Sequence, residues 1–278
     1  MKISVALCTY NGERYLSEQL NSILNQSNPV NQIIICDDAS SDNTINIIKE
    51  YSKKFPEIIS LNINKLNIGT IRNFENAILL TTGDIIFLSD QDDIWYGDKV
   101  EKMISAFNDQ SDTLLLFTNG DLIDENALSI GITLWDKWSF PVEIRKNWKK
   151  NKLAFNDLLR NYNKVTGATI AFRKELKKHI LPIQVPCGYW HDAWFALHAA
   201  ALNGLSFTED SLIQYRIHAG QQIGIPESIK PSSLNSNFNE SVSYDEFYLF
   251  IGKKYPKLFR EHYSYKLLKN LNWLIKRT

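Results

Sequence analysis

Residues 85–95 have the sequence IIFLSDQDDIW, in which a run typical of a buried strand leads directly into an acidic loop, residues 90–93. This acidic loop carries Asp90, Asp92 and Asp93, and carboxylates so close together repel one another. They therefore either face water or share something positive. Mg²⁺ or Mn²⁺ would satisfy them, because these ions take carboxylate and phosphate oxygens, but loop acids are also common as solvated turns and helix caps.

An alternation of apolar runs and amphipathic segments surrounds this stretch and extends from the N-terminus to about residue 120. Strands are predicted at residues 2–10, 31–38, 58–64 and 84–90, and helices at residues 12–26, 41–55, 69–82 and 98–109. Such alternation predicts an α/β fold with a mostly parallel central sheet flanked by helices on both faces.

Polar loops follow all four predicted strands, at residues 9–12, 37–40, 64–69 and 90–93. The carboxyl ends of parallel strands share one edge of a sheet, and open α/β sheets bind ligands at that edge, where the strand order reverses. Two of the four loops contain paired acids. The sequence therefore predicts a ligand site there and favours a metal for the acidic loop.

Composition narrows the class of protein. The chain has 278 residues, 44% of them hydrophobic, which is enough for a sizeable core. Its 31 basic and 31 acidic residues balance, so we expect no nucleic-acid partner. Cys8, Cys36 and Cys187 are predicted to be reduced thiols of a cytoplasmic protein. No signal sequence and no apolar run of about 18 residues is recognisable, so we expect neither export nor a membrane span.

The second half is less regular. Residues 132–164 are rich in tryptophan and lysine, residues 164–174 look like a strand with Gly167 at a tight point, and residues 188–204 look like a helix. Two short strands are predicted within residues 205–218, a mobile loop at 225–243 and a helix at 263–278. We divide the chain into one domain, residues 1–224, with a nucleotide-binding half (1–120) and an acceptor-side half (121–224), and a C-terminal extension, residues 225–278.

Several motifs together resemble the family 2 glycosyltransferases, which have the nucleotide-diphospho-sugar-binding fold called GT-A. The resemblance covers most of the chain: ALCTYNGERYLSEQLNSILNQ matches the opening strand and helix, IIICDDASSDNT the "DDgSxDxT" turn and NIGTIRNFENA the "N-x-G-x-x-x-x-N" element. LSDQDDIW stands at the D-x-D position, and HDAW at the position of the catalytic acid. The DQDDIW variant and VTGATIAFRK look most like bacterial enzymes described as rhamnosyltransferases.

The resemblance implies roles for individual residues. The nucleotide side would comprise Thr9, Tyr10, Glu13, Asp37, Asp38, Asn67, Arg72, Asp90 and Gln91. Among these, Asp38 would accept from a pyrimidine, Arg72 would lie near the ribose or phosphates, and Asp90 near the ribose or the metal. Asp92 would be the principal ligand of Mn²⁺ or Mg²⁺ bound to the diphosphate, with Asp93 adding or supporting a ligand.

Two late residues have competing interpretations. Asp192 begins an apolar helix, where an aspartate is usually an N-cap, but the family position makes it the general base that deprotonates the acceptor hydroxyl. His218 follows a predicted strand, where a lone histidine is usually a surface residue. Some members of the family close the metal site with a histidine about two dozen residues beyond the general base, which fits His218.

The acceptor side is less determined. Trp135 and Trp138, like Trp148, either pack against the sheet or stack on acceptor sugar rings, and Asp121, Trp190 and His191 are further acceptor candidates. The tail is either a solvated helix or a basic amphipathic helix that lies on anionic lipid. The second alternative would suit a lipid-linked acceptor at the inner face of the cytoplasmic membrane. A homodimer is left open.

We therefore expect an inverting, metal-dependent hexosyltransferase that moves a sugar from a UDP or dTDP donor to a saccharide in bacterial polysaccharide biosynthesis. The rhamnosyltransferase-like motifs suggest rhamnose, although no motif identifies the sugar. Two alternatives are a nucleotidyltransferase that acts on sugar phosphates and a catalytically inactive nucleotide-sugar-binding module. The first usually has a glycine-rich loop with a basic residue after the first strand, of which TYNGERY is a poor version.

Overall fold

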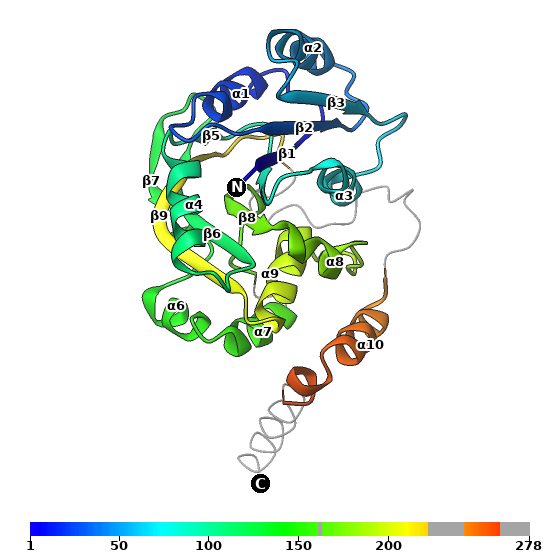
Figure 1. The fold of residues 1–278 in the computed structure, drawn as a ribbon, viewed down its shortest axis with the longest axis vertical. Helices are drawn as coiled ribbons and strands as arrows, with labels where there is room; N and C mark the ends of the chain where they lie inside the picture. The colour runs from blue at the N-terminus through cyan, green and yellow to red at the C-terminus, as the bar shows by residue number, and fades with distance from the viewer. Residues whose placement is uncertain (161–162, 222–241, 262–278) are drawn as a thin grey trace.

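The predicted alternation of strands and helices in the first 120 residues is confirmed. In the computed structural model, which describes residues 1–160, 163–221 and 242–261, four parallel strands lie in the order β3-β2-β1-β4 (Figure 1). The strands are β1 (Ile3–Thr9), β2 (Gln32–Asp37), β3 (Ile59–Ile63) and β4 (Ile85–Ser89). The helices of this half are α1 (Leu16–Leu24), α2 (Thr44–Lys54), α3 (Thr70–Leu80) and α4 (Lys99–Asp109).

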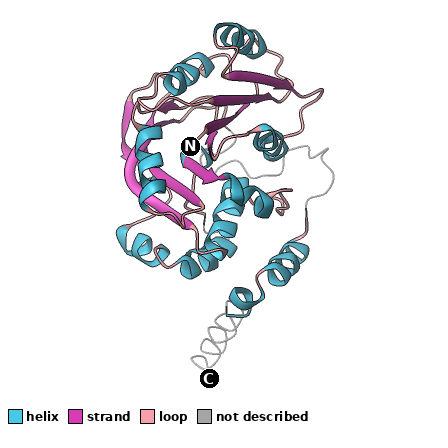
Figure 2. Cartoon of the chain, in the orientation of Figure 1, coloured by secondary structure: helices cyan, strands magenta, loops and turns pink. Residues whose placement is uncertain are grey.

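Five more strands extend the same sheet beyond β4. They are β5 (Ile94–Trp95), β6 (Leu115–Ile123), β7 (Ser129–Thr133), β8 (Ile170–Arg173) and β9 (Leu205–Arg216). The order continues from β4 through β8, β6 and β9 to β5, and β7 pairs with β6. β8 is antiparallel to β4 and β6, whereas β6 and β9 are parallel. The sheet is therefore parallel at the nucleotide-binding half and mixed beyond it, and Figure 2 shows it curling between helices.

β9 corrects one prediction. Residues 205–216 form one continuous strand rather than two short ones. Glu209 and Asp210, which look like a break in the sequence, lie on an exposed stretch of the strand. The pairing of β9 with β6 shifts register twice near this stretch, at the place where the sheet curls.

Short helices fill the tryptophan-rich region, which the sequence had left without structure. They are α5 (Leu134–Lys137), α6 (Val142–Trp148) and α7 (Asn151–Leu159). The strand predicted at 164–174 begins with a 3-10 turn, η1 (Gly167–Thr169), before β8, and a second turn, η2 (Lys174–Leu176), leads to α8 (Lys177–Ile180). The helix predicted at 188–204 is α9 (His191–Ala201).

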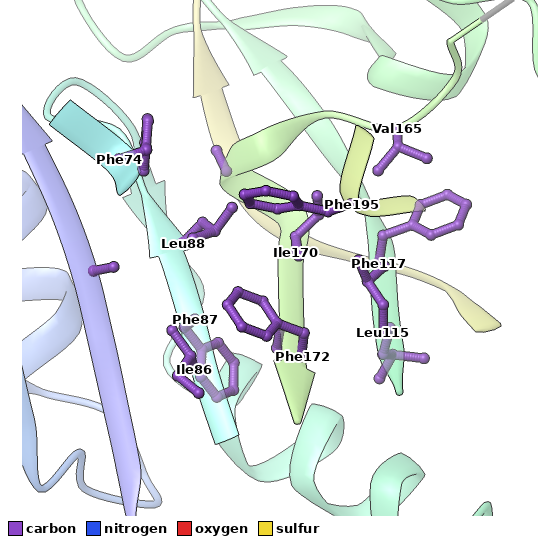
Figure 3. Close-up of a cluster of buried hydrophobic side chains, with 14 of the residues drawn as sticks. Phe74, Ile86, Phe87, Leu88, Leu115, Phe117, Val165, Ile170, Phe172 and Phe195 are labelled. Atoms are coloured by element: carbon purple, nitrogen blue, oxygen red, sulfur yellow. The ribbon is translucent and has the colours of Figure 1, made fainter. Parts of the chain in front are cut away.

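The centre of the core lies where β4, β8 and β6 meet α9. Figure 3 shows Phe87 of β4, Phe172 of β8 and Phe117 of β6 on neighbouring strands, and each is fully buried. Phe172 also packs edge-on against Phe195 of α9, with ring centres 5.9 Å apart. Burial of each such side chain stabilises the fold by about 1.5–3 kcal/mol. This packing fixes the start of α9, where Asp192 lies, relative to the central strands.

The C-terminal extension is described only in part. α10 (Tyr244–Lys254) packs against α9, where the Tyr255 hydroxyl lies 2.6 Å from His198 Nδ1. The loop predicted at 225–243, except for its last two residues, and the helix predicted at 263–278 lie outside the described residues. Within the part that is described, no helix is both long enough and apolar enough to cross a bilayer. Cys8, Cys36 and Cys187 are free thiols, as predicted.

Candidate active site

The polar loops predicted to share one edge of the sheet do lie at that edge. β1 lies between β2 and β4, so the strand order reverses beside it, and the carboxyl ends of these three parallel strands adjoin one another. Such a reversal opens a crevice in which α/β proteins bind ligands. The loops after β1, β2 and β4 therefore line one side of the candidate site.

Asp37 at the end of β2 is held by its neighbours. Its Oδ2 accepts hydrogen bonds from the hydroxyls of Thr9, at 2.7 Å, and Ser40, at 2.6 Å, and its Oδ1 accepts from the backbone N–H of Ser40. Asp37 and Thr9 are both buried. In this structure these two predicted nucleotide-binding residues shape the crevice floor, because their polar atoms already have partners within the protein.

Asp38 organises the loop that follows β3. Its Oδ1 accepts from the Ile68 N–H and the Asn64 side chain, and its Oδ2 accepts from the Gly69 N–H, each at 2.8–2.9 Å. The two backbone bonds fix the residues directly before α3. Each carboxylate oxygen has two lone pairs, so a further donor from a ligand is compatible with these bonds.

Two predicted nucleotide-binding residues lie on that loop and at the start of α3. Asn67 is half-buried. The Arg72 side chain is 53% exposed and pairs with Glu75, with 3.1 Å between Nη1 and Oε2. Arg72 is therefore near the crevice with its guanidinium largely in solvent, where an incoming anion could recruit it.

A side-chain bridge joins the loop after β1 to the acidic loop. Gln91 accepts from the Tyr10 N–H at 2.8 Å and donates to the Tyr10 carbonyl at 3.1 Å. A Cβ on Gly12 would lie only 2.2 Å from Gln91 Oε1, so glycine is needed for the close approach. Glu13 accepts from the backbone N–H of Asn43 at the start of α2, at 2.7 Å. Of Tyr10, Glu13 and Gln91, only Tyr10 has an exposed side chain that makes none of these bonds within the protein.

The structure brings Asp92 and His218 together across 126 positions of sequence. His218 Nε2 lies 2.8 Å from Asp92 Oδ2, and the side chains are only 15% and 14% exposed. Within the described residues, no three Asp, Glu, His or Cys side chains converge on one point. A carboxylate and an imidazole facing each other fit a divalent cation in place of the shared proton, with diphosphate oxygens completing its coordination.

Asp93 occupies a different position from the one expected. It is 1% exposed, and its Oδ1 accepts from the Arg216 N–H at 3.1 Å. No described residue gives its Oδ2 a hydrogen bond. Burial, with the charges of Asp92 and Asp90, raises the pKa of this carboxyl well above its usual range. Because its side chain is anchored in the interior, this position favours the supporting role predicted for Asp93 over that of a direct metal ligand.

Asp192 lies in the first turn of α9, outside the four loops that follow the parallel strands. It is 6% exposed, and burial raises its pKa to about 7 against the opposing hydrogen bonds from Ala193, Gly167 and Asn163. The N-cap of α9 is Trp190, so the alternative role of Asp192 as an N-cap is not observed. A buried carboxyl with a pKa near neutrality suits a general base.

The charge of Asp192 acts on the acidic loop. Burial raises the pKa of Asp90 to about 7, and the charges of Asp92 and Asp192 contribute to the increase. Asp192 therefore lies within electrostatic range of the acidic loop, although it comes from α9.

The acceptor candidates divide between core and surface. Trp135 is buried in a cluster with Phe117, Phe140 and Phe207, which supports the packing interpretation over sugar stacking. Trp138 is half-buried, and its Nε1 donates to Thr166 at 3.1 Å. Trp148 is also buried.

The remaining acceptor candidates lie in two places. Asp121 Oδ2 accepts from the Tyr96 hydroxyl at 2.6 Å, beside a cavity of about 280 Å³ lined by β6, β7 and β9. Trp190 is half-buried and stands two residues before Asp192. His191 is buried and stacks on Phe74 at 4.4 Å, and neither ring nitrogen has a partner among the described residues. Because it is buried, His191 presents little surface to an acceptor in this structure.

Sequence reasoning missed Arg216, which organises the metal side of the crevice. Its guanidinium is 1% exposed, donates to the Asp92 carbonyl at 2.8 Å and pairs with Glu18. It also lies over the Tyr15 ring, 4.5 Å from its centre. The spacing of two residues from His218 was the one available signal, because neighbouring strand-end residues often serve one site.

The fold is of the GT-A class, as the sequence predicts. The chain belongs to glycosyl transferase family 2, because residues 4–180 match the sequence model of that family. It is 29% identical over 236 residues to an uncharacterized glycosyltransferase of Nostoc sp., which covers 78% of this chain and 65% of the relative. It is 38% identical over 128 residues to the dTDP-rhamnosyl transferase RfbG of Shigella flexneri. This match covers 44% of this chain and 41% of RfbG. The matches thus cover less than two thirds of both relatives.

Solved structures share the fold at low sequence identity. The S. aureus protein TarS in complex with UDP superimposes with a TM-score of 0.58 at 18% identity, over 78% of this chain and 61% of the TarS chain. The mannosyltransferase PcManGT from Pyrobaculum calidifontis, in complex with GDP-Man and Mn²⁺, superimposes with a TM-score of 0.58 at 17% identity. This match covers 79% of this chain and 58% of the PcManGT chain.

Proposed function

We propose that this protein transfers a sugar, with inversion at the anomeric carbon, from a UDP or dTDP donor to a saccharide hydroxyl in a divalent-metal-dependent reaction. The observation that carries the proposal is the pair formed by Asp92 and His218, with the buried Asp192 within electrostatic range of the acidic loop. Leaving-group stabilisation and proton removal are the two tasks that an inverting transfer sets.

Asp92 and His218 would hold Mn²⁺ or Mg²⁺. The ion supplies electrostatic stabilisation of the negative charge that develops on the departing diphosphate. Arg216 keeps Asp92 in place through its bond to the Asp92 carbonyl. Asp93 supports this arrangement from the interior through the Arg216 backbone.

Asp192 would take the proton of the acceptor hydroxyl as the acceptor oxygen attacks the anomeric carbon from the face opposite the diphosphate. The new carbon–oxygen bond forms as the bond to the diphosphate breaks, and the proton passes to the carboxylate. The burial that raises the pKa of Asp192 to about 7 makes this carboxylate more basic than a solvated aspartate.

The nucleotide would bind along the loops after β1, β2 and β3. Tyr10 offers an exposed aromatic face and Arg72 an exposed cation, and Asp38 retains lone pairs for a pyrimidine N–H. Thr9, Glu13, Asp37, Asn67, Asp90 and Gln91 complete the proposed nucleotide side. The similarity to RfbG supports dTDP-rhamnose as the first donor to test.

The proposed setting is bacterial polysaccharide biosynthesis in the cytoplasm, at the inner face of the membrane if the acceptor is lipid-linked. Asp121, Trp138 and Trp190 remain the proposed acceptor contacts. Asp121 is favoured by the adjoining cavity, which has room for a monosaccharide.

Calorimetric titration with UDP, dTDP, GDP and CDP, each with Mn²⁺ and with chelator, tests the proposal. We expect one pyrimidine diphosphate to bind only when the metal is present. NMR of the product from the matching donor would then show the anomeric configuration, where retention would contradict the proposed mechanism. Metal-dependent binding without transfer or donor hydrolysis would favour an inactive module, and release of pyrophosphate from a nucleoside triphosphate would favour a nucleotidyltransferase.

A further inference from the structure

Lys99, the first residue of α4, is completely buried beneath the acidic loop. Its ammonium nitrogen lies 4.1 Å from the centre of the Trp95 ring and donates a hydrogen bond to the Ala168 carbonyl at 2.7 Å. Lysine is rarely buried unless its charge is compensated. Burial lowers the pKa of Lys99 to about 7, and the charges of Asp93 and Asp90 oppose this shift.

The partner of Lys99 belongs to the segment that supports Asp192. Ala168 is the middle residue of η1, and Gly167, the preceding residue, lies against Asp192: a Cβ on Gly167 would be 3.9 Å from Asp192 Cβ, and the Gly167 N–H lowers the pKa of the Asp192 carboxyl. Gly167 is also tightly packed, because a Cβ there would lie 3.2 Å from His191 Nε2. One lysine side chain therefore connects the surroundings of the acidic loop to the turn that hydrogen-bonds the proposed general base.

We propose that Lys99 is a positioning residue that ties the turn supporting Asp192 to the acidic loop, and so sets the geometry of the general base relative to the metal side. This inference rests on the proposed function, because it assigns Asp192 as the base. Without the ammonium, the buried Ala168 carbonyl loses its partner, and η1 is free to rotate the Gly167 N–H away from Asp192. Lys99 itself touches no reacting atom.

The test compares Lys99→Met, which keeps the apolar length of the side chain, with Lys102→Met on the same helix. Lys102 is exposed and pairs with Asp98 and Asp210, so its loss removes a charge from α4 without touching η1. The readout is the pKa of Asp192, followed by carboxyl ¹³C NMR in the unliganded protein and assigned with Asp192→Asn.

We expect the pKa of Asp192 to rise by about one unit in Lys99→Met, because one N–H donor to the carboxylate is lost, and to stay unchanged in Lys102→Met. A merely structural lysine would lower the thermal midpoint and leave the pKa of Asp192 as in the wild type, which would overturn the proposal. Should Lys99→Met not fold, the smaller neutral Lys99→Gln falls short of Ala168 and is titrated instead, with the same two outcomes.

This readout requires no nucleotide, metal or acceptor. If the calorimetric screen fails, the proposed function is in doubt, whereas the bridge from Lys99 to Asp192 is judged separately by the titration. If donor binding is found, Lys99→Met is expected to retain the donor affinity within about threefold and to lose at least about tenfold in kcat. An equal loss of affinity and turnover would instead assign Lys99 to the binding of the donor.

Discussion

Replacement of Asp192 by asparagine is expected to stabilise the protein while it abolishes sugar transfer. Asparagine has nearly the same shape, and its Oδ1 can still accept from Asn163 and from the Ala193 N–H, the bonds that Asp192 makes at 3.0 and 2.6 Å. The substitution therefore removes mainly the ability to carry a charge. Because Asp192 is 6% exposed, that charge is costly in the folded state.

The size and sign of the effect follow from the pKa of Asp192. Folding raises this pKa from 3.8 to about 7. Between these two values the folded state holds a proton that the unfolded state has released, so raising the pH through this window destabilises the wild type. The two pKa values differ by about three units, and each unit corresponds to about 1.36 kcal/mol. The charge of Asp192 therefore destabilises the wild type by at most about 4 kcal/mol above pH 8, and it causes no destabilisation below pH 4.

The assay is urea unfolding of the wild type and Asp192→Asn in chelator at several pH values from 5 to 8. The variant's advantage in free energy of unfolding should grow with pH. This advantage includes the repulsion between the charges of Asp192 and Asp90, which the substitution also removes. Asp109→Asn, an exposed substitution at the end of α4, should follow the wild type at every pH. A difference between Asp192→Asn and the wild type that does not change with pH would refute the reasoning.

Three further substitutions separate the parts of the site. Asp92→Ala should abolish metal-dependent nucleotide binding in calorimetry, whereas intact binding would remove Asp92 from the metal site. His218→Ala should weaken Mn²⁺ binding at least about tenfold, measured by titration of the ion in the presence of nucleotide. Gly12→Ala should displace the Gln91 side chain, since its Cβ would lie 2.2 Å from Oε1. It should therefore weaken nucleotide binding several-fold, with little change in the thermal midpoint.

The nucleotide-binding half was predictable because its physics is local. Parallel strands covered on both faces give continuous apolar runs, such as IIIC before Asp37 and IIFLS before Asp90, and polar residues begin where burial ends. The strands that extend the sheet beyond β4 obey no such rule. β7 is an edge strand with exposed Ile130 and Ile132, and β5 is only two residues long, so neither gives a clear periodic signal.

The site was predictable to the extent that residues lie at strand ends. Asp92 follows a strand, and His218 follows another, so sequence position and family resemblance together paired them. Lys99 and Arg216 escaped notice because a cation in a polar stretch looks like a surface residue. Their burial depends on which strands and turns cover them, and no local pattern encodes that information.

Two buried basic side chains, together with the raised pKa values of Asp90 and Asp93, answer why three carboxyl groups can stand so close together. Arg216 bonds the Asp92 carbonyl and, through its backbone N–H, Asp93, while Lys99 lies below within electrostatic reach of Asp93 and Asp90. The acidic loop is therefore held by the protein itself, and the proposed ion would be needed for the donor diphosphate rather than for the fold. Chelator alone should then shift the thermal midpoint by less than about 2 °C, whereas Mn²⁺ with the nucleotide that binds should raise it. A large loss of stability in chelator would instead show that the ion, and not Arg216 and Lys99, balances the acidic loop.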